Sequence, residues 1–407
     1  MRIVDVSAFY TPAGGGVRTY VHRKLAAAGA AGHEIVAIVP GPDDSVEERA
    51  PGQFVATIKS PKMPVDRRYH FFGNEAQLHR AIDAWQPDHL ECSSPWSSAS
   101  MVARWPGAAP RSLIMHADPL SAYAYRWFGS IASIETIDRR FDRFWRHLRT
   151  LDRQYDLIVS ASADFTRRLA AGGLTRVRTI PMGVDPGHFS PTLRDPAMRA
   201  AILRSLDLSE EALLLIGVGR YSPEKRWDLV IDAVMAAGQS RPIGLLLVGE
   251  GRIRKRLEKH ASGSPHVVIG DPVADRATLA RLMASADGLV HGCEAETFCM
   301  VAAEARASGL PLIVPDRGGA ADHVVGPDDI AYRATDPIAL RDAIRRFAPS
   351  PRDGTIPLVR TMDAHFRELF DAYGLLAQPG NAALAAASRA AVGQEPTGRR
   401  GLSSLRR

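Results

Sequence analysis

Cysteine is scarce in this chain of 407 residues, which has three cysteines, Cys92, Cys293 and Cys299. None of them lies in a Cys-x-x-Cys pair, which argues against both a disulfide framework and a zinc site. Unpaired cysteines are typical of a reducing compartment, and we therefore expect a cytoplasmic protein.

Long apolar runs are also lacking. No stretch of about 18 apolar residues occurs, so no transmembrane helix is predicted. The N-terminal segment MRIVDVSAFY begins a strand-like run in place of the apolar segment of a signal peptide. The net charge of +6 suits anionic partners, namely nucleotides, phospholipid surfaces or nucleic acid. Because no RNA- or DNA-binding motif is present, nucleic acid is the least favoured of the three.

What the sequence does have is a globular composition, with 45% hydrophobic and 24% charged residues and a length typical of two domains. In the first half, a glycine loop at Thr11–Gly16 precedes a helix that is expected from Val17 to about Ala31 and stops at Gly32. Strands and helices alternate in this region, which predicts a doubly wound α/β domain. The expected strands are Ile3–Ser7, Glu34–Val39, Asp88–Cys92, Ser112–His116 and Asp156–Ala161.

Three features of this half each allow two interpretations. His116 ends a strand, where ligands bind in such sheets, or it is a histidine satisfied by backbone groups. Lys59–Gly73 is an acceptor-binding lip or a long exposed connection. Ile134–Arg153 has apolar residues at spacings of three and four, which favours one amphipathic helix packed on the domain. The alternative is contact with an anionic membrane through Arg139, Arg140, Arg143 and Arg146.

The segment Ile180–Pro191 interrupts the alternation with Pro, Gly and Asp, which predicts a domain boundary. A second alternating series follows. Arg220 and Lys225 flank a loop at the end of one of its strands, where two cations would neutralise a diphosphate or would be ordinary surface charges. The expected strands of this series are Leu213–Val218, Ile243–Val248, Val267–Ile269 and Asp287–His291.

The stretch Glu294–Gly319 combines a short helix, a buried strand and a glycine turn, and it carries Glu296 and Glu304 with seven residues between them. Thr297 is the expected N-cap of the helix. Helical rise makes the span between the two glutamates roughly 12 Å at most. That span exceeds the roughly 5 to 9.5 Å of a glycoside hydrolase carboxylate pair. It suits two hydroxyl-rich groups with an anion between them, as in a nucleotide sugar, and the amides of Phe298, Cys299 and Met300 would offer an anion site.

Five motifs occur in a fixed order, namely GGGV at 14–17, GR(x4)K at 219–225, VGEG at 248–251, IG at 269–270 and the two spaced glutamates. In this set the chain resembles family 4 of the retaining nucleotide-sugar glycosyltransferases, from residue 1 to about 377. The resemblance implies the GT-B fold, in which two Rossmann-like α/β domains face each other across a cleft. It implies an acceptor-binding domain at 1–184, a nucleotide-sugar-binding domain at 185–360 and a crossover helix at 361–377. Residues 378–407 lie outside it, and their composition predicts a disordered basic tail.

The resemblance also assigns roles to residues. Glu304 would hold the ribose, Glu296 the donor sugar, and Arg220 with Lys225 the diphosphate. His116 would lie near the reaction centre, so that the catalytic set is His116, Glu296, Arg220 and Lys225. The full donor-binding set is Gly15, Gly16, Gly219, Arg220, Lys225, Glu250, Gly270, Glu296, Phe298, Cys299, Met300, Val301 and Glu304. Cys299 and Met182 depart from the family pattern, which usually has Gly and Asn at these positions.

The resemblance implies a retaining hexosyltransferase of cell-envelope biosynthesis that forms an α-linkage by front-side displacement. Its donor would be a GDP- or UDP-hexose and its acceptor a lipid-linked glycan or a polysaccharide. No cofactor is obligatory, and a divalent metal is compatible but not required. Peripheral contact with the inner face of an anionic membrane fits this activity, and the oligomeric state stays open. A nucleotide-sugar epimerase on the same fold and a non-catalytic nucleotide- or carbohydrate-binding module are the alternatives.

Overall fold

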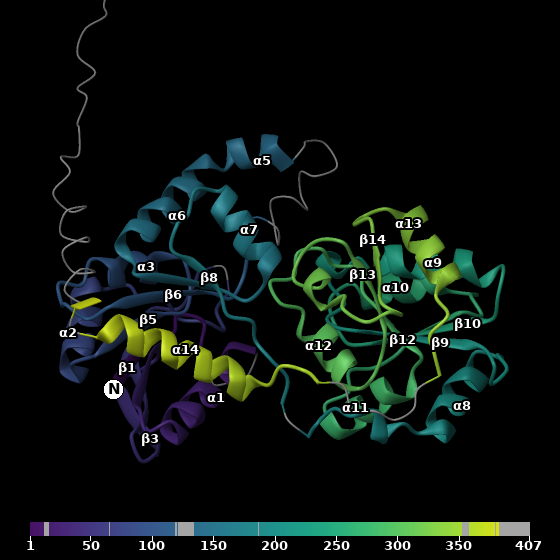
Figure 1. The fold of residues 1–407 in the computed structure, drawn as a ribbon, viewed down its shortest axis with the longest axis horizontal. Coiled ribbons are helices and arrows are strands. Elements are labelled where there is room, and N and C mark those ends of the chain that lie inside the picture. The colour runs from purple at the N-terminus through teal and green to yellow at the C-terminus, as the bar shows by residue number, and fades with distance from the viewer. Residues whose placement is uncertain are drawn as a thin grey trace, which may run out of the picture.

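The computed structural model describes residues 1–11, 16–64, 66–118, 120, 134–185, 187–351, 358–378 and 380–381. Gly15 and all of the predicted tail beyond residue 381 lie outside the described residues. Among the described residues, the chain folds into two α/β halves that lie side by side (Figure 1). The predicted fold class is confirmed.

The first half contains a sheet with the strand order β3-β4-β2-β1-β5-β6-β7-β8, in which β3 and β4 pair antiparallel and the other neighbours pair parallel. Its strands are β1 Arg2–Val6, β2 Glu34–Gly41, β3 Ser45–Ala50, β4 Gln53–Lys59, β5 His89–Cys92, β6 Arg111–Met115, β7 Leu157–Ser160 and β8 Val177–Thr179. Its helices are α1 Gly16–Ala30, α2 Glu75–Trp85, α3 Ser97–Ala103, α5 Ile134–Arg140, α6 Asp142–Gln154 and α7 Ala163–Ala171.

The second half contains a parallel sheet with the strand order β11-β10-β9-β12-β13-β14. Its strands are β9 Leu213–Val218, β10 Ile243–Val248, β11 Val267–Ile269, β12 Gly288–Val290, β13 Leu312–Pro315 and β14 Ile330–Tyr332. Its helices are α8 Pro196–Ser205, α9 Trp227–Gly238, α10 Arg254–Ala261, α11 Arg276–Ser285, α12 Met300–Ala307 and α13 Pro337–Arg346, and α14 Met362–Ala377 returns to the first half.

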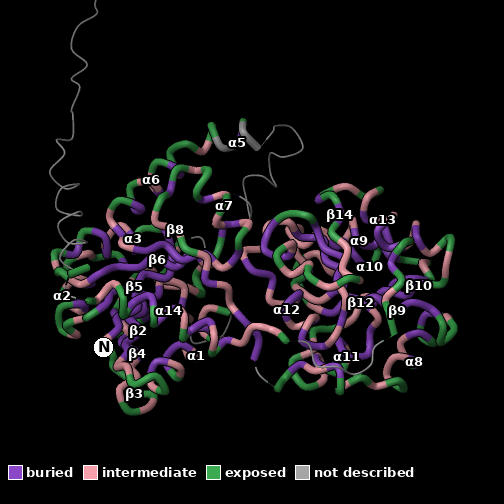
Figure 2. Tube along the Cα trace, viewed as in Figure 1, coloured by how far each residue is buried: buried purple, intermediate pink, exposed green. Residues whose placement is uncertain are grey.

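The central strands of both sheets are buried on their two faces, as continuous apolar strands require (Figure 2). In β1, Ile3 packs on the side of α1 and α14, whereas Val4 and Val6 pack on the opposite side. In β9, Leu215 packs on one face of the second sheet and Leu214 packs on the other. The alternation along each strand therefore places a separate apolar core on each face.

In each sheet, the side on which the chain adds successive strands changes at the first strand. From β1 the chain adds β2, β4 and β3 on one side and β5 to β8 on the other, and from β9 it adds strands on both sides in the same manner. Open α/β sheets bind ligands beyond the carboxyl ends of strands at such a switch point. The segments that begin at Ser7 and at Gly219 are therefore the expected walls of a site.

Two features differ from the sequence-based expectations. The helix predicted over Ile134–Arg153 is divided at Phe141, whose backbone (φ −96°, ψ 19°) separates α5 from α6. The hairpin of β3 and β4 was not predicted, because Ser45–Ala50 is polar and exposed and gives no apolar period. Within the described residues, no helix is long and apolar enough to cross a membrane.

Two chain segments cross between the halves, and they pair with each other. Val184 and Thr361 form a parallel bridge, in which the Val184 amide donates to Arg360 O (2.9 Å) and the Met362 amide to Val184 O (3.0 Å). A Cβ atom on Gly183 would approach the Thr361 carbonyl carbon to 2.3 Å, so the close crossing requires glycine. Thr361 also caps α14, because its hydroxyl accepts a hydrogen bond from the Ala364 amide at 3.1 Å.

Helix α14 is held on the first half by two buried histidines. His365 Nδ1 lies 3.0 Å from Pro181 O and His365 Nε2 lies 2.9 Å from the Tyr20 hydroxyl. Because a carbonyl only accepts, Nδ1 carries the proton and Nε2 accepts from Tyr20, which is the neutral ring. His89 stacks on Tyr373 at a centroid distance of 3.8 Å. Burial lowers the pKa of His365 to about 4 and that of His89 to about 3.

We predict that the protein loses stability as the pH falls from about 6.5 to about 4. In this window the unfolded state binds protons that the folded His365 and His89 do not, so the free energy of unfolding decreases with falling pH. The full loss from His365 is about 3 kcal/mol. Urea unfolding at several pH values should show a shallower pH dependence for His365→Gln than for the wild type. His260→Gln, at an exposed position, is the matched control, and an unchanged slope in His365→Gln would contradict the prediction.

Candidate active site

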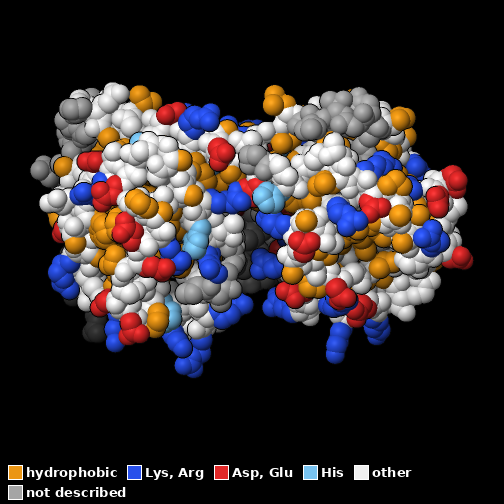
Figure 3. Space-filling model, turned by 90° about the horizontal axis from the view of Figure 1, so that it is seen from below, with side chains coloured by type: hydrophobic (Ala, Val, Ile, Leu, Met, Phe, Trp, Pro, Cys, Tyr) orange, Lys and Arg blue, Asp and Glu red, His pale blue; other side chains and the backbone are white. Residues whose placement is uncertain are grey.

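A groove separates the two halves, and Lys and Arg side chains border it (Figure 3). A cavity of about 430 Å³ between the halves is lined from the first half by Gly16, Tyr20 and His116. From the second half it is lined by Met300 and Glu304. The structure therefore brings together predicted residues that lie nearly 200 positions apart in the sequence, as Glu304 and His116 do.

Glu304 lies in α12 and is mostly buried beside one cation, since its Oε1 accepts from the Arg276 guanidinium at 3.1 Å. Burial raises the pKa of Glu304, and Arg276 partly opposes this shift. Arg276 also lies 3.6 Å from Asp185, which in turn contacts Arg23 of α1. The four side chains form a charged chain across the groove. Arg276, Asp185 and Arg23 were not singled out from the sequence, because no local motif distinguishes them from surface charges.

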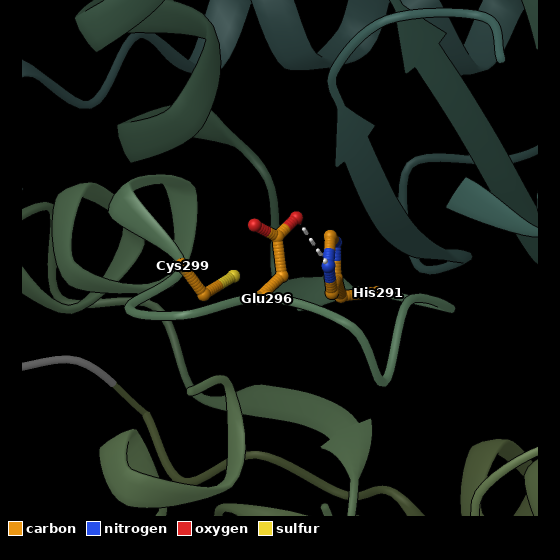
Figure 4. A group of neighbouring side chains, drawn as sticks. All are labelled: His291, Glu296 and Cys299. Carbon is orange, nitrogen blue, oxygen red and sulfur yellow. Dashed lines mark ion pairs between the residues drawn. The ribbon is translucent and has the colours of Figure 1, made fainter. Parts of the chain in front are cut away.

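Glu296 lies in the loop between β12 and α12, where Lys225 Nζ contacts its Oε1 and His291 Nε2 lies 3.3 Å from the same oxygen (Figure 4). Burial alone would raise the pKa of Glu296, but the neighbouring His291 and Lys225 hold it well below its usual range. For His291, burial lowers the pKa of the imidazole, which keeps this ring neutral. Lys225 was predicted to bind a diphosphate, and here its ammonium group pairs with Glu296.

His291 was missed in the sequence analysis as a site residue. The one signal for it is its place at the carboxyl end of a strand, next to the loop that carries Glu296. His291, Glu296 and Cys299 have potential metal-ligand atoms within 4.8 Å of one another. Lys225 already supplies a positive charge to Glu296, and burial raises the pKa of the Cys299 thiol well above its usual value. Within this group the carboxylate of Glu296 is thus already neutralised by Lys225.

The start of α12 differs from the prediction. The N-cap is Cys299, in the left-handed conformation (φ 68°, ψ 70°), and the helix begins at Met300. Thr297 is not the cap, because its hydroxyl donates across the groove to His116 O at 3.0 Å. Phe298 is buried, and its carbonyl accepts from His323 Nε2 at 2.7 Å. The backbone thus turns before the helix, and Val301 lies in its first turn.

The backbone of the loop that follows β9 is tightly packed. Gly219 has φ 153°, and a Cβ atom on Gly249 would lie 2.0 Å from Gly219 O. The Tyr221 amide donates to Glu250 O (2.6 Å), and the Tyr221 hydroxyl donates to Gly270 O (2.8 Å). The predicted positions Glu250 and Gly270 are therefore joined through Tyr221, whereas Gly219 lies against Gly249. The side chains of Glu250 and Arg220 are exposed, and neither lines the cavity of about 430 Å³ within the described part of the chain.

His116 follows β6, and its ring packs edge-on against Tyr20 at a centroid distance of 4.7 Å. Burial lowers the pKa of His116 to about 4, and the positive charge of Lys24 adds to this effect. The imidazole is therefore neutral near pH 7, and its Nε2 is buried without a hydrogen-bond partner within the described residues. A buried polar atom without a partner is rare in native structures.

Comparisons with known proteins agree with this architecture. Residues 14–188 match the family model described as Glycosyltransferase Family 4, and residues 212–349 match the model described as Glycosyl transferases group 1. The chain is 30% identical over 354 residues to a GDP-mannose-dependent alpha-(1-6)-phosphatidylinositol dimannoside mannosyltransferase of Mycobacterium tuberculosis (strain H37Ra). That alignment covers 86% of this chain and 88% of the relative.

Solved structures show the same fold at low sequence identity. Sucrose-phosphate synthase of Thermosynechococcus elongatus superposes with a TM-score of 0.63 at 21% identity, over 96% of this chain and 98% of that one. Anabaena Alr3699/HepE in complex with UDP superposes with a TM-score of 0.60 at 15% identity, over 96% and 99%. The fold and the family matches together define a glycosyltransferase with a nucleotide-sugar donor. More narrowly, the chain belongs to glycosyltransferase family 4, with the GT-B arrangement of two facing α/β halves.

We predict that Glu304→Ala weakens GDP binding more than Glu296→Ala does. GDP has the ribose expected at Glu304 but lacks the sugar expected at Glu296. The loss of hydrogen bonds to a charged group corresponds to about a 10- to 100-fold increase in Kd for Glu304→Ala. Titration calorimetry measures both variants, with the exposed Glu47→Ala of β3 as the control. The reverse order of the two affinities would contradict the assigned roles.

Proposed function

We propose that this protein transfers a mannosyl group from GDP-mannose to a lipid-linked glycan acceptor, with retention of the α-configuration. The observation that carries this proposal is the cavity between the halves, on which His116 from one half and Glu304 from the other both border. The choice of donor and acceptor is supported by the mycobacterial relative, whose name specifies GDP-mannose and a phosphatidylinositol dimannoside.

In this proposal the donor lies mainly on residues 185–360. Glu304 holds the ribose hydroxyls, while Arg276 donates to one of its two carboxylate oxygens. Glu296 accepts hydrogen bonds from the sugar, and Lys225 holds that carboxylate ionised at neutral pH. The exposed Arg220 is free to turn toward the diphosphate. A cation that reaches the diphosphate stabilises negative charge as it develops on the leaving group.

The acceptor lies on residues 1–184 with the crossover helix 361–377 packed behind them. Its hydroxyl oxygen attacks the anomeric carbon on the face from which the diphosphate departs, and the hydroxyl proton passes to the departing phosphate oxygen. His116 is neutral and orients a hydroxyl by hydrogen bonding, without acting as a cation. Lys225 and Arg220 supply the positive charge that the leaving group needs, so a divalent metal is compatible with the reaction but not required by it.

A panel of nucleotide sugars tests the donor. We expect GDP-mannose to raise the melting temperature most, because a donor at 100 times its Kd adds about 2.7 kcal/mol to stability. GDP release should accelerate when a mannoside acceptor is added. Conversion of the donor sugar into another sugar in the absence of an acceptor would identify an epimerase. Donor binding without turnover would identify a binding module. Either result contradicts the proposed transfer.

We further propose peripheral contact with an anionic membrane, where a lipid-linked acceptor would reside. Arg139, Arg140, Arg143 and Arg146 are exposed on α5 and α6 and give this region a basic face. Co-sedimentation with vesicles containing anionic lipid should succeed at low salt and weaken with added salt. Charge reversal of Arg140 and Arg143 to glutamate should reduce binding. Failure of the wild type to bind even at low salt would remove this contact from the proposal.

A further inference from the structure

Two carboxylates join the halves where helix α7 of the first half faces the second half (Figure 1). The Gly318 amide donates to Asp164 Oδ2 at 3.0 Å, and the Ala163 amide donates to Asp322 Oδ2 at 2.5 Å. Each half thus supplies one carboxylate and one backbone amide, and we refer to these two bonds as the aspartate clasp. Ala161, which precedes α7, packs against the apolar cluster of the second half.

The start of α7 explains why a carboxylate binds there. The first amides of a helix lack partners within the helix, and the helix dipole favours an anion at this end. Ser162 is the N-cap, and its hydroxyl accepts from the Phe165 amide at 3.2 Å, so Asp322 takes a different amide, that of Ala163. Helix α7 therefore keeps its own cap when Asp322 is replaced. Loss of that carboxylate removes a contact between the halves and leaves the helix capped.

The loop that receives Asp164 lies directly on the backbone of the segment that carries Glu296. A Cβ atom on Gly318, which has φ 78°, would lie 2.3 Å from Glu294 O. The Gly319 amide donates to Glu296 O at 2.7 Å, and a Cβ atom on Gly319 would lie 2.5 Å from the Phe298 nitrogen. Since the two backbones touch without intervening side chains, a shift of Gly318 is passed on to Glu296.

The other end of the same loop is bonded in the same two directions. Asp322 and His323 lie in a short 3-10 turn at Ala321–His323. Asp322 binds α7, and His323 Nε2 donates to Phe298 O at 2.7 Å while its ring packs edge-on against Phe298 at 4.8 Å. Burial lowers the pKa of His323, so the donor is the N–H of a neutral ring. The loop is thus held between α7 and the Glu296 segment at both of its ends.

A direct contact with the first half adds to this indirect one. Thr297, the neighbour of Glu296, donates its hydroxyl hydrogen bond to His116 O at 3.0 Å. The carboxylate expected to receive the donor sugar is therefore located by contacts with the opposite half. Glu304, which is expected to hold the ribose, is paired with Arg276 of its own half. The two glutamates consequently differ in how strongly their positions depend on the first half.

We propose that the aspartate clasp positions Glu296 for the donor sugar, so that a helix of the first half sets the sugar geometry of the second half. Asp164 and Asp322 are positioning residues, which act through the loop between them and Glu296. The proposal rests on the proposed function, in which Glu296 accepts hydrogen bonds from the sugar. It requires that recognition of the sugar depends on the clasp, whereas recognition of GDP, with its ribose at Glu304, does not.

Titration calorimetry with GDP-mannose and with GDP tests the proposal. Asp164→Ala and Asp322→Ala should each raise the Kd for GDP-mannose about 5-fold, as the loss of one capping hydrogen bond does, and leave the Kd for GDP unchanged. Asp322→Asn should restore most of the affinity, because its amide oxygen still accepts at a helix start. The double alanine variant should lose less than the product of the two single losses, since both residues hold one loop.

Arg167→Ala is the matched control for these variants. Arg167 pairs with Asp164 Oδ1 at 3.3 Å, so this change removes a surface ion pair but leaves Oδ2 on the Gly318 amide. It should bind both nucleotides as the wild type does. An unchanged Kd for GDP-mannose in the folded alanine variants, or an equal loss of affinity for GDP, would overturn the role of the clasp in sugar recognition.

Amide hydrogen exchange of residues 294–300 and 316–323 needs no nucleotide and keeps this test separate from the proposed function. Exchange should be faster in Asp164→Ala and Asp322→Ala than in the wild type and unchanged in Arg167→Ala, because the clasp opposes local opening of these segments. A wild type that binds no nucleotide sugar would refute the proposed function, whereas faster exchange in the variants would still support the clasp as the element that positions Glu296. Unchanged exchange in both alanine variants would overturn the clasp itself.

Discussion

The first half is assembled around one buried ammonium group. Lys24 of α1 is fully buried and donates to Asp5 of β1 at 2.6 Å and to Glu91 of β5 at 2.5 Å. Tyr373 of α14 donates to the second oxygen of Glu91 at 2.6 Å. Helix α1, strands β1 and β5 and the crossover helix α14 are therefore joined at one point. Removal of one charged partner would leave the other buried and unpaired, at a cost of several kcal/mol. The same ammonium helps lower the pKa of His116, so a structural contact reaches a residue of the candidate site.

The architecture was predictable from the sequence because it depends on patterns that are local. Apolar runs bounded by glycines, such as Leu213–Val218 before Gly219, identify buried parallel strands without knowledge of their neighbours. The crossover helix was implied only by the family resemblance, and the structure shows that Thr361 caps it within one turn. Where local pattern and tertiary packing disagreed, packing prevailed. Phe141 divides a helix whose apolar spacing continues across it, and Thr297 binds the opposite half instead of capping α12.

The site was only partly predictable, because its members are joined by contacts over long sequence distances. Glu296, Glu304, Lys225 and His116 were selected from an ordered set of motifs, and their roles remain predictions. The partners that govern their charges were not selected. Arg276 pairs with Glu304, and His291 lies beside Glu296. In the sequence, however, Arg276 looks like any surface arginine and His291 like any histidine at the end of a strand. Lys24 was the least predictable of these residues, because a lysine within a helix is normally exposed to solvent.

The paired crossing at Val184 and Thr361 constrains how the halves can move. A single linking strand would let one half swing freely in several directions, whereas two strands joined by hydrogen bonds resist sliding past each other. Because α14 begins directly at this pair and is anchored on α1, it must turn with the first half as one body. The hydrogen-bonded pair therefore restricts the relative movement of the two halves more than a single linking segment would.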